Sequence, residues 1–159
     1  MRYVPDTVIL IDYLNAIPAA IKWLNEQHDD CVLTPITRAE VLAGCEAQMI
    51  DVTNRWLDTF AQCDIDHTIA NTAAALRKSL RVKLPDAMQA ACASTLGLTF
   101  LTRNTKDFNR RKFSALLVPY RIVVLVREQS VLNPRNVTKR EVRTPLNLDH
   151  RKQRVPAAR

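Results

Sequence analysis

Four carboxylates occupy positions where ligand-binding groups gather in α/β proteins: Asp6, Glu40, Asp86 and Asp107. Asp6 follows a short apolar stub, and Asp107 follows the apolar run LTFL and a polar turn. Glu40 and Asp86 each lie close to an expected helix start. In an open α/β sheet, the carboxyl ends of strands and the helix starts that follow them share one edge, so we expect Asp6, Glu40 and Asp107 to converge there. The helix of Asp86 precedes its strand and must be arranged differently, but Asp86 can still reach that edge from a neighbouring layer.

Carboxylates gathered at one edge repel one another unless a cation compensates their charge. All-oxygen donor sets select hard divalent ions such as Mg²⁺ or Mn²⁺, which activate water in metal-dependent nucleases. Each acid also has an ordinary explanation. Asp6 and Asp86 suit the positive end of a helix dipole, Glu40 suits a capping box with Thr37, and Asp107 suits a turn. The residue types alone leave both explanations open.

The stretch Leu84–Phe108 carries the clearest pattern of elements. Asp86, directly after a proline, opens a helix of small residues that ends at Gly97. The run LTFL is typical of a short buried strand, and the polar turn 102–106 then leads to Asp107.

Elsewhere, apolar periodicity and turn residues predict further helices and strands. Helices are expected over about residues 6–16, 18–27, 52–62 and 69–80 and from about Arg38, and strands over 1–4, 31–34 and 120–126, with 63–66 as a further candidate. The run VILI at 8–11 also suits a strand, which is the alternative to the first helix. Strands separated by helical crossovers form parallel sheets. The expected fold is therefore α/β, a three-layer α/β/α domain with a short parallel sheet flanked by helices.

The net charge of +7 is concentrated at the carboxyl end. Residues 1–126 hold 14 basic and 13 acidic residues, whereas residues 127–159 hold 9 basic and 3 acidic ones. We therefore expect a nearly neutral domain over 1–126, followed by a basic extension over 127–159 that is largely disordered. Such an extension either attracts RNA or is simply solvated.

Several function classes are disfavoured by composition. Only 2 glycines are present, too few for a P-loop or a dinucleotide fingerprint. The 4 cysteines lack metal-ligand spacing, which favours reduced thiols. No signal peptide or membrane-spanning run is visible, so a cytoplasmic protein without membrane contact is expected.

Three strings carry a family resemblance: DTVILIDYL at Asp6, TRAEVLAG around Glu40, and LPDAMQAACASTLGLTFLTRNTKDF. Together they resemble the PIN-domain ribonucleases, and within that group the toxins of bacterial VapBC toxin–antitoxin pairs. The resemblance covers about residues 1–126. It implies a Mg²⁺- or Mn²⁺-dependent endoribonuclease whose metal site and catalytic residues are Asp6, Glu40, Asp86 and Asp107. In this assignment Asp6 and Asp86 are direct ligands, while Glu40 and Asp107 hold a second metal position or orient water.

The resemblance also implies neighbours and partners of that site. Thr7, Thr102, Arg103 and Asn104 are expected to line it, with Asn104 binding a metal-bound water. The partners implied are an RNA substrate, a cognate antitoxin whose carboxy-terminal segment occupies the groove, and a second copy of the chain. One departure concerns the first block, where Pro5 shortens the strand and Val8 stands where the family often has Asn or Ser.

Two other functions compete with the toxin. One is a non-catalytic RNA-binding or scaffold protein with a degenerate PIN fold, and the other is a PIN ribonuclease for RNA processing without an antitoxin. The presence of all four acids favours an enzyme over the scaffold. The gene upstream separates the two enzymes, because a short DNA-binding antitoxin is normally encoded there.

Overall fold

Short parallel strands form the centre of the molecule in the computed structural model, which describes residues 1–108 and 113–122. The strands are β1 (Tyr3–Pro5), β2 (Val32–Leu33), β3 (Ala61–Gln62), β4 (Thr99–Leu101) and β5 (Leu116–Leu117). One sheet has the order β1-β4-β5, a second pairs β2 with β3, and every pairing is parallel. An isolated parallel bridge between Tyr3 and Cys31 sets the second sheet beside the first.

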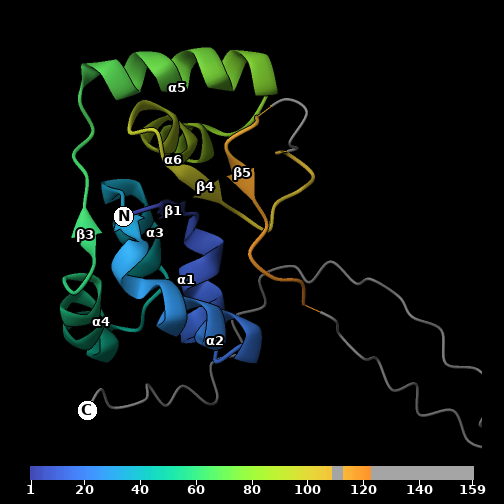
Figure 1. Ribbon diagram of the computed structural model, residues 1–159. Helices are drawn as coiled ribbons and strands as arrows, with labels where there is room; N and C mark the ends of the chain where they lie inside the picture. Colours follow the sequence, from blue (N-terminus) through green and yellow to red (C-terminus); the bar gives the residue numbers. More distant parts are fainter. Residues whose placement is uncertain (109–112, 123–159) are drawn as a thin grey trace, which may run out of the picture.

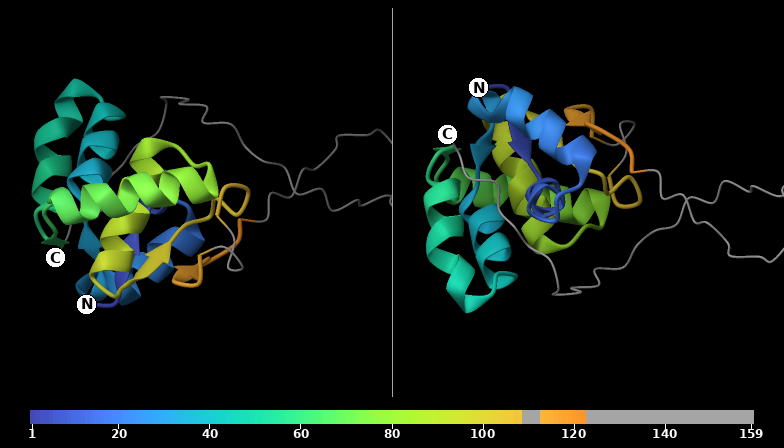
Figure 2. Two further views of the ribbon diagram at one scale, coloured as in Figure 1. Left: turned by 90° about the horizontal axis from the view of Figure 1, so that it is seen from above. Right: turned by 90° about the horizontal axis from the view of Figure 1, so that it is seen from below.

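Helices cover both faces of these strands, as predicted for a three-layer α/β/α domain. They are α1 (Thr7–Leu14), α2 (Pro18–Gln27), α3 (Pro35–Ala43), α4 (Ile50–Leu57), α5 (His67–Leu80) and α6 (Leu84–Thr95), with 3₁₀ turns η1 (His28–Asp30) and η2 (Ala47–Met49). Figure 1 shows α5 and α6 above β1 and β4, with α1 to α4 below. The end of α5 and the turn after β4 lie on the same side of the molecule in each view (Figures 1 and 2).

Strand β4 separates two hydrophobic clusters. Successive strand residues point to opposite faces. Phe100 accordingly joins the cluster beneath α5 and α6, while Leu101 joins the cluster of α1 to α4. Phe108 packs edge-on against Phe100, with ring centroids 5.1 Å apart, and both rings are fully buried. Phe108 therefore anchors the carboxyl end of the turn that carries Asp107.

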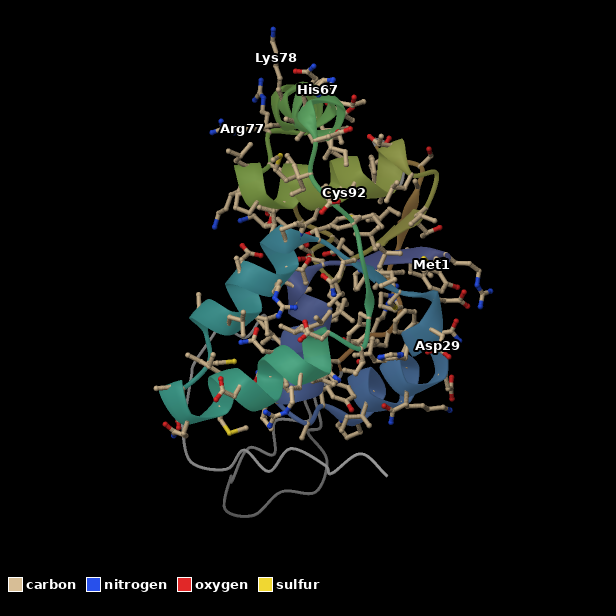
Figure 3. The ribbon with its side chains drawn as sticks, turned by 90° about the vertical axis from the view of Figure 1, so that its left-hand side faces the viewer. Met1, Asp29, His67, Arg77, Lys78 and Cys92 are labelled. Carbon is tan, nitrogen blue, oxygen red and sulfur yellow. The ribbon has the colours of Figure 1, made fainter. Side chains whose placement is uncertain are left out.

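Helix α6 is buried because its side chains are small. Four of its alanines have no exposed surface: Ala87, Ala90, Ala91 and Ala93. Their small size allows α5 to pack closely against α6. In Figure 3, Cys92 lies on α6 beneath α5, whereas Arg77 and Lys78 project outward from α5. The four cysteines are free thiols, as predicted.

The prediction of a first helix is confirmed and its strand alternative is wrong. The backbone is extended at Asp6, with φ −61° and ψ 149°, and the helix begins at Thr7. Ile9 and Leu10 are thereby fully buried in the cluster of α1 to α4.

The predicted capping box of Thr37 and Glu40 is wrong. Helix α3 begins earlier, at Pro35, which needs no backbone partner at a first helical position. The cap is Thr34, whose Oγ1 accepts a hydrogen bond from the Thr37 N–H at 3.0 Å. Glu40 thus lies in the second turn, and its carboxylate is available for contacts outside the helix.

Predictions for other helices and strands also differ from the structure. Helix α4 ends at Leu57 rather than near residue 62, because residues 61–62 pair with β2 as strand β3. The candidate strand at 63–66 is absent, since Asp66 instead caps α5 through the Ile69 N–H. The last described strand is β5 at 116–117, and not a strand beginning at Tyr120.

Residues 123–126 of that predicted strand, the predicted domain boundary at 126 and the basic extension 127–159 lie outside the described residues. Within the described part, no helix is by itself long and apolar enough to cross a membrane. Helix α1 and the segment Pro18–Asp30 meet the length and composition criteria only as a pair bent by 116°.

Candidate active site

Asp6 lies at the junction of β1 and α1, where the pairing of β1 with β4 fixes its position. Its backbone N–H donates to the Leu101 carbonyl at 2.8 Å, which continues the pairing of the two strands. Its side chain interacts with the Val8 backbone in the first turn of α1 and also reaches the next strand end. There Thr102 Oγ1 donates to Asp6 Oδ2 at 2.5 Å. Asp6 and Thr102 thus meet at the carboxyl ends of adjacent parallel strands, the edge that the sequence predicted.

The environment of Asp6 disfavours its charged form. Burial raises the pKa of this carboxyl to about 6, and the negative charges of Asp86 and Glu40 push it in the same direction. The hydrogen bond from Thr102 opposes this shift of the pKa but does not cancel it. Only 8 % of the residue is exposed. Asp6 is therefore held close to two other carboxylates in a poorly solvated place.

Asp86 is the third residue of α6 and is half-buried. Its pKa is raised by burial and then by the charges of Glu40 and Asp107, with Lys83 acting in the opposite direction. Asp86 therefore interacts electrostatically with each of the other three acids. The structure thus brings Asp86 within electrostatic range of Asp6, Glu40 and Asp107.

Glu40 is held from two directions by buried groups. Its Oε2 accepts hydrogen bonds from Thr7 Oγ1 at 2.5 Å and from Gln89 Nε2 at 3.0 Å. Gln89 has no exposed surface. Gln89 is not among the site residues predicted from the sequence. It could have been recognised as a polar residue within the run of small apolar residues in α6. Gln89 follows Asp86 by three positions and therefore lies on the same helix face.

The turn after β4 is organised around Asn104. Its N–H donates to Thr102 Oγ1 at 2.9 Å, and its Nδ2 donates to Asp107 Oδ2 at 2.7 Å. The Asp107 N–H donates back to Asn104 Oδ1 at 3.3 Å. Thr102 thus connects the Asp6 carboxylate to the turn, and Asn104 connects the turn to Asp107.

Arg103 lies on the same turn, but its charge is engaged with α1. The guanidinium forms a bidentate pair with Asp12, Nε to Oδ2 at 2.5 Å and Nη2 to Oδ1 at 2.8 Å. Tyr120 adds a hydrogen bond from its hydroxyl to Asp12 Oδ2 at 2.9 Å. In this structure Arg103 braces the turn against α1, whereas the sequence placed it among the residues lining the site.

The donor chemistry of the four acids fits a hard divalent cation, because all donors are carboxylate oxygens and their charges repel one another. Among the described residues, however, no three Asp, Glu, His or Cys side chains form a ready-made metal-binding cluster. The fit therefore rests on donor type and charge, and not on a preformed coordination shell.

Comparison with known proteins relates the chain to one family. The model described as "PIN domain" matches residues 3–114. A structure described as a toxin-antitoxin complex from Klebsiella pneumoniae is 33 % identical, with a TM-score of 0.69 over 76 % of this chain and 99 % of that chain.

More distant structures share the fold. FitAcB from Neisseria gonorrhoeae is 21 % identical, with a TM-score of 0.58 over 76 % of this chain and 99 % of that chain. VapBC2 from Rickettsia felis, bound to a fragment of promoter DNA, is 18 % identical, with a TM-score of 0.59 over 74 % of this chain and 96 % of that chain. No curated protein sequence matches the chain.

Proposed function

Because the chain belongs to the PIN domain family, we propose that it is a Mg²⁺- or Mn²⁺-dependent endoribonuclease and the toxin of a toxin–antitoxin pair. Proteins of this family are generally nucleases, and such nucleases generally use divalent metal ions. The observation that supports the proposal is the electrostatic interaction of Asp86 with the other three acids, which adds to burial in raising the pKa values of Asp6 and Asp86. A structural role for these acids offers no reason to gather like charges.

The role proposed for each acid follows from the family resemblance. Asp6 and Asp86 are the proposed direct ligands, and Glu40 and Asp107 complete the metal site or orient the attacking water. When bound, the ion supplies activated water and neutralises charge that develops on the phosphoryl group. Thr102 fixes one oxygen of Asp6, and Asn104 fixes one oxygen of Asp107. The chain thus orients Asp6 and Asp107 before any ion or RNA arrives.

The partner we propose is an antitoxin, because the 33 % identical structure is described as a toxin-antitoxin complex. An arginine of such a partner would pair with Asp86 or Glu40 through charge-assisted hydrogen bonds and compete with the metal ion. A homodimer is also proposed, and it rests on the family resemblance alone. The large apolar residues Leu24, Leu57 and Phe60 are buried in the core and do not offer a surface for it. Since RNA is the proposed substrate, the proposed location is the cytoplasm.

The test is cleavage of a panel of tRNAs and rRNA fragments by purified protein, with Mn²⁺ or with excess chelator. We expect cleavage only with the metal. Asp86→Asn should reduce the rate by more than about 100-fold, because a direct ligand should matter more than the outer groups that typically cost 10–100-fold. The matched control is Asp64→Asn, an exposed acid outside the site, which should cleave like the wild type.

Binding of RNA without cleavage would instead identify the non-catalytic scaffold. Cleavage that is not toxic on expression, with no antitoxin gene upstream, would identify the RNA-processing enzyme. Full activity of a folded Asp86→Asn protein, with host nucleases excluded, rules out the assigned metal site.

A further inference from the structure

Gln89 is a fully buried polar residue in a helix whose other buried residues are small and apolar. Its amide is nevertheless fully engaged. Nε2 donates to Thr7 Oγ1 and to Glu40 Oε2, both at 3.0 Å, and Oε1 accepts from the Thr7 N–H at 3.3 Å. A buried amide without partners costs about 1–3 kcal/mol, and an apolar side chain would fill a core position without that risk. Packing of the core therefore does not explain a glutamine at this position, but the hydrogen bonds of its amide do.

The direction of these hydrogen bonds follows from one group that can only donate. The Thr7 backbone N–H needs an acceptor, so the amide oxygen of Gln89 must face it. The amide nitrogen then faces Thr7 Oγ1 and Glu40. Because Thr7 Oγ1 accepts from this nitrogen, its own hydrogen is left to donate to Glu40 Oε2.

The consequence falls on Glu40. Oε2 accepts two hydrogen bonds, from Thr7 and from Gln89. Oε1 accepts no side-chain hydrogen bond from the residues that the structure describes. The carboxylate also interacts electrostatically with Asp6 and Asp86. Oε2 of Glu40 is thus bound by the protein, whereas Oε1 can contact a bound ion or water.

We propose that Gln89 is a positioning residue that, together with Thr7, holds Glu40 so that a single oxygen, Oε1, is presented to the metal ion or to its water. The proposal rests on the metal site of the proposed function. Since Gln89 and Asp86 share one face of α6, the contact also fixes Glu40 relative to a proposed direct ligand on a different element. A glutamate that is already ordered loses less rotamer freedom when an ion binds.

The experiment measures Mn²⁺ affinity by calorimetry on the full chain, without RNA. Gln89→Met keeps the volume of the side chain but removes the amide, and we expect it to weaken Mn²⁺ binding about tenfold or more. Thr7→Val removes the other hydrogen bond to Glu40 Oε2 and should weaken binding in the same direction. The matched control is Met88→Leu, the preceding residue on α6, which should bind like the wild type.

A double-mutant cycle separates positioning from a general effect on the fold. If Gln89 acts through Glu40, then Gln89→Met should change Mn²⁺ affinity little in a Glu40→Ala background. An equal loss in both backgrounds overturns the proposal, as does wild-type affinity in Gln89→Met. Should Gln89→Met not fold, Thr7→Val in the same cycle decides, because it tests the same carboxylate oxygen.

The outcomes also separate this proposal from the proposed function. A wild-type protein that binds Mn²⁺ but cleaves no RNA contradicts the nuclease, while the cycle still decides the role of Gln89. A wild-type protein that binds no Mn²⁺ overturns both.

Discussion

The two sides of the acidic site are held in different ways. Asp6 and Glu40 accept hydrogen bonds from buried groups far away in the sequence, at separations of 96 residues for Thr102 and 49 for Gln89. Asp86, in contrast, experiences burial and neighbouring charges but accepts no side-chain hydrogen bond from the described residues. Asp107 is held by Asn104, three residues before it. One side is therefore positioned by tertiary contacts and the other by local backbone geometry.

This difference predicts different roles for the two sides in binding an ion. A carboxylate that accepts hydrogen bonds from the protein presents its remaining oxygen in a fixed direction, because the fold sets its orientation. A carboxylate with both oxygens available can adjust to an incoming ion. Substitutions on the first side should therefore change stability as well as activity, and those on the second side should act mainly on activity.

The largest effect on stability is expected from Asp6 as the pH changes. Without metal, the pKa of this carboxyl rises from 3.8 to about 6 on folding, so the folded state holds its proton more tightly than the unfolded state. The stabilisation is fully present below the unfolded value and is lost as the pH rises through about 6. Its size is about 3 kcal/mol, from a shift of roughly two pKa units. Urea unfolding from about pH 4 to about pH 7 in chelator should show this loss in the wild type.

Asp6→Asn should flatten that dependence, because the amide does not titrate. Asp64→Asn, the exposed control, should retain it. Equal pH dependence in the wild type and Asp6→Asn would show that Asp6 is not the strained carboxylate, and the contrast between the two sides would lose its main support.

A smaller decrease in the free energy of unfolding is expected from Arg103→Met. The substitution leaves Asp12, whose side chain is only 9 % exposed, without its cation. Fully buried pairs broken in this way lose about 3–5 kcal/mol, and we expect about 2 kcal/mol here because the Arg103 side chain is 26 % exposed. Lys106→Met removes an exposed cation from the same turn and should change the free energy of unfolding little. Equal unfolding free energies for the two variants would mean that the bidentate pair does not brace the turn.

The smallest effect should come from Asn104→Ala. The substitution removes both hydrogen bonds between the Asn104 side chain and Asp107. Because both are only partly buried and one is 3.3 Å long, the free energy of unfolding should fall by only about 1 kcal/mol. Cleavage at saturating Mn²⁺ should fall about tenfold, because Asp107 is no longer oriented. Thr105→Ala, at an exposed position of the same turn, is the control. An Asn104→Ala protein with wild-type cleavage would remove Asp107 from the machinery.

The predictable part of the molecule is the part encoded locally. The helix at 18–27, a strand within LTFL and a helix start within two residues of Asp86 follow from periodicity, caps and turn residues within short windows. The acids were found in the same way, because strand ends and helix starts can be read from the sequence. The PIN fold was recognised from three such blocks and is confirmed.

What the sequence did not predict depends on residues far apart. The residues around Gln89 in the sequence do not indicate that it contacts Glu40. Those around Arg103 likewise do not indicate its pairing with Asp12, 91 residues away. Strand β5 exists because Leu116 and Leu117 pair with β4, whereas the longer apolar run from Tyr120 has the stronger local propensity. Such contacts depend on how the whole chain packs and cannot be predicted from local sequence patterns.

The pairing of β1 with β4 has a consequence for the synthesis of the protein. Asp6 is among the first residues made, yet Leu101 and Thr102, which hold it, are translated almost a hundred residues later. Contacts of such long sequence separation form only after the intervening chain is available to fold. The site therefore cannot assemble on a nascent chain until Asp107 has left the ribosome. For the proposed ribonuclease, the messenger that encodes it is translated nearly to the end of the domain before any active site exists to cut it.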